Sequence, residues 1–262
     1  MNAAKPDDQN LPRMPALFIG HGSPLNALED SEYSQAWAAL GQNLPRPKAI
    51  LCISAHWQTD GTRVTAMPQP KTIHDFYGFP QALFDFVYPA PGSPALATRI
   101  KVQMAGIELD QDWGLDHGSW SILCHLFRNA DIPVLQLSLD TKKSPEQHYQ
   151  LGKALRCLRD EGVLIVGSGN IVHNLQAAIW RDTAHDWAVA FAELVKRLIA
   201  AGDHSAVVKY RELSDAALAI PTDEHFLPLL YILGLQEDGE QVGFITDKTT
   251  LGAIAMLSVQ IG

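Results

Sequence analysis

Val163-Leu-Ile-Val-Gly-Ser-Gly-Asn-Ile-Val-His173 is the segment that indicates the fold class of this chain most directly. Its first four residues are aliphatic and do not alternate with polar residues. Such a run is typical of a strand buried on both faces of a parallel sheet. The glycine-rich turn after it presents a histidine. It is not a nucleotide-binding loop, because it matches neither G-x-x-x-x-G-K-[ST] nor G-x-G-x-x-G.

The same arrangement occurs twice earlier in the chain. Ala16-Leu-Phe-Ile-Gly-His21 and Ala49-Ile-Leu-Cys-Ile-Ser-Ala-His56 each place a histidine directly after an apolar run. We therefore expect strands at residues 15–20, 48–55 and 163–167. In open α/β sheets, ligands bind outside the carboxyl ends of the strands. Histidines that follow separate strands should consequently meet in one crevice.

Helical patterns separate the apolar runs. Ser144-Pro-Glu-Gln147 is a helix start with a capping serine, and apolar residues follow it at helical spacing up to Gly162. We expect helices at residues 31–42, 94–106, 119–128, 145–161, 183–201, 205–214 and 225–233. Further strands are expected at residues 62–67, 107–110, 132–139, 241–245 and 253–260. This order predicts an α/β fold, with a central, mostly parallel mixed sheet flanked by helices on both faces of a single domain.

Composition limits the classes of function. The chain has 262 residues, 47% of them apolar, and a formal net charge of −9. Nucleic-acid binding is not expected, because phosphate contacts need clustered Lys and Arg. Membrane association is not expected either, because no apolar run reaches the length of a span. The oligomeric state is left open by the sequence.

The compartment and the domain boundaries follow from other features. Three scattered cysteines and a polar N-terminus without a signal-peptide core predict a cytoplasmic protein. A catalytic domain is expected at residues 14–262, after a flexible tail at residues 1–13.

A third element brings in another possible metal ligand. His225 lies in Asp223-Glu-His-Phe226, at the start of an apolar helix. Together with His21 and His56 it would give three nitrogen ligands and leave coordination positions open, as in a catalytic metal site. Glu224 is the alternative ligand, because adjacent helical residues point about 100° apart and only one can face the ion. We expect His225 to be the ligand.

The remaining histidines divide by their surroundings. His173 is a metal ligand or a general acid/base, and the sequence does not separate the two roles. His117, in Asp116-His-Gly-Ser119, is a candidate for contact with the substrate, and His74 lies in a long loop at residues 68–80 that could also touch it. Three more histidines lie among polar residues and are expected on solvated faces: His148, His185 and His204.

Seven motifs in one order resemble the 4,5-DOPA extradiol dioxygenase group of the class III extradiol ring-cleavage superfamily, and its bacterial members in particular. They are Gly20-His-Gly-Ser-Pro24, Ser54-Ala-His-Trp57, Thr72-Ile-His-Asp-Phe-Tyr-Gly-Phe-Pro80, Tyr88-Pro-Ala-Pro-Gly-Ser-Pro94, Asp116-His-Gly-Ser-Trp120, Gly167-Ser-Gly-Asn-Ile-Val-His-Asn174 and Glu224-His-Phe-Leu-Pro-Leu229. The resemblance implies one non-haem metal ion held at positions 21, 56 and 225. It also implies an acid/base or ligand role for His173 and a substrate-side role for His117.

The resemblance and the histidine pattern together predict a function. The chain would open the ring of a catechol such as 4,5-DOPA with O2, beside the two hydroxyls, to give a semialdehyde acid. His173 is the expected base and His117 its partner on the substrate side. One Fe(II) or Zn(II) ion per chain is the expected cofactor. The alternatives are a zinc-dependent hydrolase of the same fold and a metal-binding relative without dioxygenase activity.

Overall fold

The strands and helices follow the predicted order. In the computed structural model, which describes residues 13–262, the strands are β1 (Ala16–Gly20), β2 (Ala49–Thr59), β3 (Thr62–Thr65), β4 (Ile107–Asp110), β5 (Val134–Asp140), β6 (Val163–Gly169), β7 (Val242–Thr246), β8 (Thr249–Thr250), β9 (Ile254–Ala255) and β10 (Ser258–Ile261). The helices are α1 (Glu32–Asn43), α2 (Gln81–Phe84), α3 (Pro94–Gln103), α4 (His117–Leu126), α5 (Pro145–Ala154), α6 (Arg156–Asp160), α7 (Asp186–Ala200), α8 (His204–Val208), α9 (Ala216–Ala219) and α10 (Leu227–Leu235). Three short 3-10 turns complete the order: η1 (Pro24–Ala27), η2 (Leu175–Ala177) and η3 (Tyr210–Glu212).

Eight strands form one sheet in the order β4-β3-β5-β2-β6-β1-β10-β7. Its centre is parallel: β5, β2, β6 and β1 run the same way, in a register that pairs Ala49 with Val163 and Ala16 with Ile165. β10 is antiparallel to both β1 and β7, and β3 is antiparallel to β5. The prediction of a mixed, mostly parallel sheet in an α/β domain is thus confirmed.

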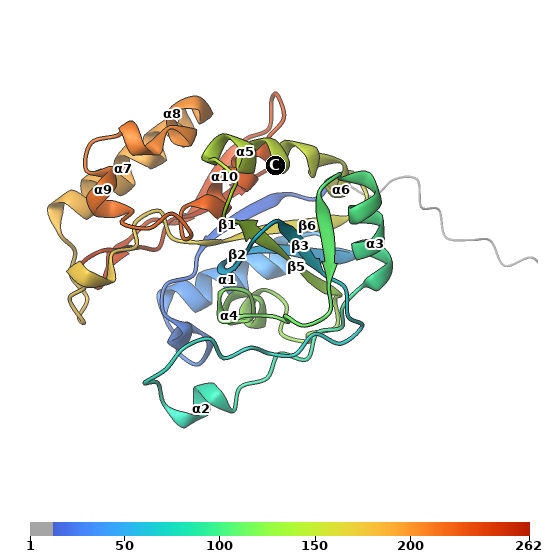
Figure 1. Cartoon of the computed structure of the whole chain (residues 1–262). Helices are drawn as coiled ribbons and strands as arrows, with labels where there is room; N and C mark the ends of the chain where they lie inside the picture. The colour runs from blue at the N-terminus through green and yellow to red at the C-terminus, as the bar shows by residue number, and fades with distance from the viewer. Residues whose placement is uncertain (1–12) are drawn as a thin grey trace, which may run out of the picture.

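Helices cover both faces of the sheet (Figure 1). Because successive strand residues point to opposite faces, β1 contributes to two apolar cores. Leu17 and Ile19 pack with Trp37 of α1 and Trp120 of α4. Phe18 belongs to the core on the other face, which also contains α10 and most of α7's apolar side. α10 is apolar all round and buried along its length, as a central helix should be.

Some boundaries differ from those predicted. The helix expected at residues 145–161 breaks at Leu155, where one backbone N–H is shared among the carbonyls of the preceding turn, and α5 and α6 result. The segment expected as one helix at residues 205–214 forms α8 and η3. The strand expected at residues 253–260 splits into β9 and β10, and the register with β7 shifts at Ser258. α2 has no counterpart among the expected helices.

Arg13 is the first described residue, and the side chain of His148 is buried. The tail predicted at residues 1–13 lies outside the described residues except for Arg13, which forms an ion pair with Asp160 at 3.4 Å. The expectation of a solvated His148 is wrong, because this side chain is fully buried in α5. Its Nδ1 lies 2.9 Å from the hydroxyl oxygen of Tyr231, so it belongs to the face of α5 that packs on α10. Within residues 13–262, no helix combines the length and apolarity needed to cross a bilayer.

Candidate metal centre

β1 and β2 lie on either side of β6 and present two histidines at the same edge of the sheet. His21 directly follows β1, and its backbone N–H donates to the carbonyl of Gly169 at the end of β6 (3.1 Å). β2 runs past its predicted end, and its register with β5 shifts between Ile53 and Gln58. The residues between them are released from regular pairing with β5, which lets His56 turn toward His21.

His225 comes from the turn that precedes α10. Its carbonyl accepts the backbone N–H of Asn170 at 2.9 Å, which ties this turn to the segment after β6. A Cβ atom on Gly169 would lie 2.1 Å from the same carbonyl oxygen, so the position requires glycine. The Gly-Ser-Gly-Asn segment therefore seats His225 against the strand ends.

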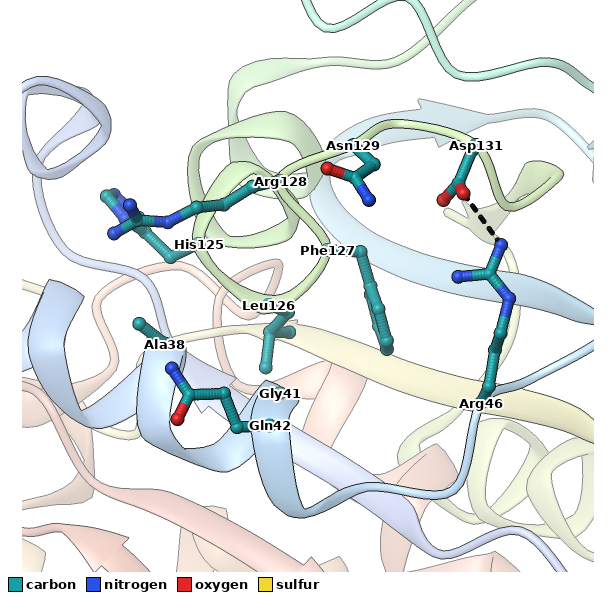
Figure 2. A pocket seen from close by; sticks show the side chains of 10 residues that line it. All are labelled: Ala38, Gly41, Gln42, Arg46, His125, Leu126, Phe127, Arg128, Asn129 and Asp131. Carbon is teal, nitrogen blue, oxygen red and sulfur yellow. Dashed lines mark ion pairs between the residues drawn. The ribbon is translucent and has the colours of Figure 1, made fainter.

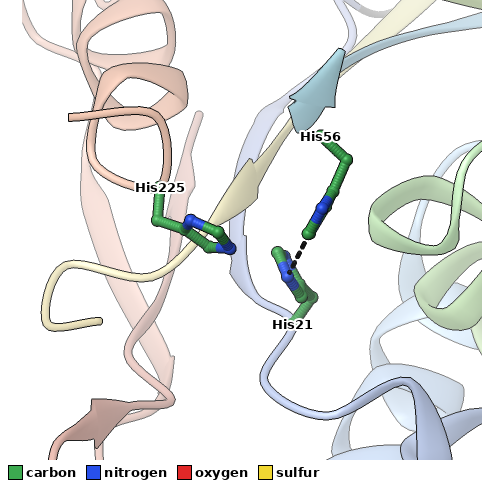
Figure 3. Close-up of side chains that lie close together, drawn as sticks. All are labelled: His21, His56 and His225. Atoms are coloured by element: carbon green, nitrogen blue, oxygen red, sulfur yellow. Dashed lines mark hydrogen bonds between the residues drawn. The ribbon is translucent and has the colours of Figure 1, made fainter. Parts of the chain in front are cut away.

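The three imidazoles of His21, His56 and His225 meet at one point (Figure 3). Nε2 of His21 and Nε2 of His56 are 3.1 Å apart. Each of the three residues offers a ring nitrogen within 4.8 Å of the other two. The ring centroids are 5.0–5.4 Å apart. The structure thus brings together the three residues that the sequence predicts as metal ligands.

Nδ1 of each of these histidines lies 3.0–3.3 Å from a side-chain oxygen atom. Ser168 donates its hydroxyl hydrogen to the carbonyl of Gly118, so its Oγ accepts from Nδ1 of His21, at 3.0 Å. Nδ1 of His56 lies 3.3 Å from a carboxylate oxygen of Asp75. Nδ1 of His225 donates to Glu224 at 3.1 Å. These partners place the proton on Nδ1 and leave each Nε2 with a free lone pair, as is usual for metal-binding histidines.

This donor set fits one divalent metal ion. Two Nε2 lone pairs 3.1 Å apart repel one another unless a cation lies between them. Nitrogens bound to a single ion at about 2.0–2.1 Å are separated by roughly 3 Å, which agrees with the distance between His21 and His56. Three imidazoles without a cysteine suit Fe(II) or Zn(II) and leave further positions open. Glu224 lies behind His225 rather than among the three imidazoles.

The electrostatic surroundings keep the three imidazoles neutral. Burial lowers the pKa of His21 and of His225 well below the usual value, and the neighbouring imidazoles lower it further. Burial also lowers the pKa of His56, against the opposing effect of the Asp75 carboxylate. A neutral imidazole is the form that binds a metal, so at neutral pH no proton has to leave before an ion binds.

His173 lies beside this cluster of three. Its ring stacks on that of His225, with centroids 3.5 Å apart and planes 9° apart. It forms a second close group with Glu224 and His225. Burial lowers the pKa of His173 to about 4, so its imidazole is neutral at pH 7.

His117 begins α4 and lies over His56, with ring centroids 3.9 Å apart. The next residue, Gly118, has no room for a side chain, because its Cβ would lie 2.9 Å from Cδ2 of His56. Asp116 caps α4 by accepting the backbone N–H of Ser119, as a helix N-cap does. His117 itself is buried.

The groups that support the histidines are not evident from the sequence. Asp75 and Ser168 lie within the motifs quoted above, but no role is predicted for either residue. A signal was available only for Ser168, which directly follows the strand expected at residues 163–167. His74 does not join the three imidazoles: its Nε2 donates to the carbonyl of Phe86 at 2.9 Å, and its ring lies against Trp120.

The surface hollow drawn in Figure 2 is a different feature. It encloses about 240 Å³ between α1 and α4 and is closed at one side by an ion pair of Arg46 with Asp131, at 2.8 Å. These two residues precede β2 and β5, so they lie at the amino ends of strands whose carboxyl ends face the histidines. None of the ten residues that line this hollow belongs to the histidine cluster.

Comparison with known proteins gives four consistent matches, to one family, two relatives and one solved structure. Residues 15–259 match the family described as the catalytic LigB subunit of aromatic ring-opening dioxygenase. A 4,5-DOPA dioxygenase extradiol of Escherichia coli is 50% identical, over 95% of each chain, and one of Beta vulgaris is 40% identical, over 87% of this chain and 89% of the other. The crystal structure of an uncharacterised protein from Escherichia coli K12 superimposes with a TM-score of 0.84 at 44% identity, covering 95% of this chain and all of the other.

Proposed function

The chain belongs to the family of catalytic LigB subunits of aromatic ring-opening dioxygenases, and from this membership we propose that it cleaves a catechol such as 4,5-DOPA with O2. The family makes it an enzyme, an extradiol ring-cleavage dioxygenase. The choice of catechol and of metal belongs to the proposal. Cleavage would occur beside the two hydroxyls, and both atoms of O2 would enter the semialdehyde acid product.

The observation that carries this proposal is the set of three imidazoles with their Nε2 atoms turned to one point. His21, His56 and His225 would hold a single Fe(II) ion. When bound, this ion would supply adjoining positions for the catechol oxygens and for O2, and a route for electrons between them. Fe(II) is proposed rather than Zn(II) because zinc has no redox chemistry.

The protein's own groups would handle the protons. We assign His173 as the base that accepts a proton from a catechol hydroxyl and later returns it to the opening ring. Its stacking on His225 places it next to the cluster, and its imidazole is neutral at pH 7 because burial lowers its pKa. His117, which lies over His56, would hydrogen-bond to oxygen atoms of the bound substrate. Phe76 packs edge-on against His117 at 5.6 Å and would help to wall this side from water.

The test begins with metal-free protein loaded with Fe(II) under anaerobic conditions. It is then mixed in air with 4,5-DOPA and a panel of other catechols, while oxygen uptake and the yellow colour of a ring-opened product are followed. We expect one O2 consumed per catechol opened. A His225→Ala variant serves as control and should bind no stoichiometric iron. Iron-loaded wild-type protein that consumes no O2 with any catechol would contradict the proposal.

A parallel sample loaded with Zn(II) separates the alternatives. We expect it to be inactive toward catechols. Hydrolysis of an ester or amide by the zinc form would support the hydrolase instead, and inactivity of both forms would support a metal-binding relative. A small aromatic diol and O2 are the proposed partners. A cytoplasmic location stays a prediction from the sequence.

A further inference from the structure

Asp75 lies where the loop at residues 68–80 reaches the metal centre, and its carboxylate contacts two histidines from different elements. Oδ1 accepts the backbone N–H of His117 at 3.0 Å and lies 3.0 Å from Nδ1 of the same residue. Oδ2 lies 3.3 Å from Nδ1 of His56. Only 17% of the Asp75 side chain is exposed. One carboxylate thus contacts both the end of β2 and the start of α4.

The loop that carries Asp75 is held in place from several directions. Ile73 donates its backbone N–H to the carbonyl of Leu115 at 2.7 Å, and Leu115 donates to Lys71 at 2.8 Å. Nε1 of Trp120 donates to the carbonyl of Ile73 at 2.8 Å. The exposed side chain at the loop's outer turn is Tyr77, at 92%. Asp75 is therefore presented by a segment already fastened to α4 and to the residues before it.

We propose that Asp75 is a positioning residue, which turns Nε2 of His56 toward the ion and fixes the ring of His117 beside it. This inference rests on the proposed metal site. Both carboxylate oxygens face N–H groups, so both must be acceptors. An asparagine offers only one acceptor, and its NH2 group would then face either His56 or the backbone of His117, donor against donor. An aspartate is consequently required by chemistry and not only by size.

The experiment measures metal binding, which does not depend on catechol cleavage. The affinity of metal-free protein for Zn(II) is determined by competition with a coloured chelator, for the wild type and for Asp75→Asn. We expect Asp75→Asn to bind Zn(II) about 10- to 100-fold more weakly, the usual effect of removing such a support. The absorption spectrum of the Co(II) form should also change, because it reports the arrangement of the ligands. The thermal midpoint of the metal-free protein should change little.

Two controls make the result specific. Asp85→Asn makes the same chemical change at an exposed position of the neighbouring segment, where Asp85 only accepts from Gln81, and it should leave both readouts unchanged. His56→Ala gives the loss expected when a ligand itself is removed. Should Asp75→Asn not fold, Asp75→Ala avoids the clash of donors and gives the same readouts.

Two results would overturn the proposal. One is an Asp75→Asn protein whose Zn(II) affinity and Co(II) spectrum equal those of the wild type. The other is a loss of binding as complete as that of His56→Ala, which would make Asp75 a ligand. Wild-type protein that binds metal but opens no catechol would count against the proposed function. The metal-binding measurements would still test the role of Asp75.

Discussion

The surroundings of the ring nitrogens differ among the clustered histidines. This difference separates the proposed metal ligands from the proposed acid/base residue. His21, His56 and His225 each have an oxygen atom behind Nδ1 and turn Nε2 inward. Glu224 lies beside Nδ1 of His225, and the imidazole is the member of this pair that groups with His21 and His56. His173 instead stacks on His225 from outside.

We predict that His173→Ala binds one metal ion per chain but opens catechols about 10²–10⁴-fold more slowly, as expected when a general acid/base is removed. The physical reason is that the variant keeps all three Nε2 donors and loses only the proton acceptor. Metal content and kcat on the same preparation check this. Loss of the metal would identify His173 as a ligand, and near-normal turnover would leave it without a role.

His148 leads to a prediction about pH. Burial, with the nearby charge of Lys143, lowers the pKa of His148 to about 4 in the folded chain, whereas a free histidine titrates near 6.5. Below pH 6.5 the unfolded chain therefore binds a proton that the folded chain refuses, and stability falls until pH 4 is reached. The free energy of unfolding is measured with urea at pH 7.5 and at pH 5. Between these pH values, His148→Gln should lose on the order of 2 kcal/mol less of this free energy than the wild type. An equal loss in both proteins would contradict it.

At the scale of elements, the sequence predicts most strands and helices because their apolar periodicity is local. The 107–110 strand and the capped start of α5 at Pro145 are reproduced. The misplaced boundaries depend on distant contacts. β2 continues past Ala55 because β5 runs beside it as far as Asp140. The histidines could be picked out by their positions after strands, but Asp75 could not, because its partners are 19 and 42 residues away along the chain.

Because α5 packs on α10, we predict that a glycine-to-alanine substitution in α5 destabilises the protein, which is the opposite of the effect expected from helix propensity. Alanine normally stabilises a helix relative to glycine by about 1 kcal/mol. A Cβ atom on Gly152, however, would lie 2.3 Å from the carbonyl oxygen of Tyr231 in α10. We expect Gly152→Ala to lower the free energy of unfolding by about 1–3 kcal/mol, as overpacking does. Gly243→Ala, where no atom lies within 4 Å of the added carbon, is the control and should be nearly neutral. A stabilised Gly152→Ala protein would show that the two helices can move apart.

At the scale of the whole molecule, the parallel centre of the sheet explains why the histidines meet. β1, β6 and β2 are neighbours, so His21 and the turn after Gly169 emerge side by side, and His56 turns toward them from the bulged part of β2. α10 then packs over β6 and brings His225 to the same edge. The topology rule for open α/β sheets foresees this convergence. It does not foresee the position of His225, because the position of α10 is set by packing among segments far apart in sequence.

Because the metal would join β1, β2 and the start of α10, we expect it to stabilise the whole domain. An ion that binds only the folded chain adds about 2.7 kcal/mol at a free concentration one hundred times its Kd. For a protein of this size, such a gain corresponds to a thermal midpoint higher by roughly 5–10 °C. Thermal unfolding at pH 7.5, with metal-free protein and with added Zn(II), checks this. His225→Ala should lose the shift, so an equal shift in this variant would place the stabilising ion elsewhere on the protein.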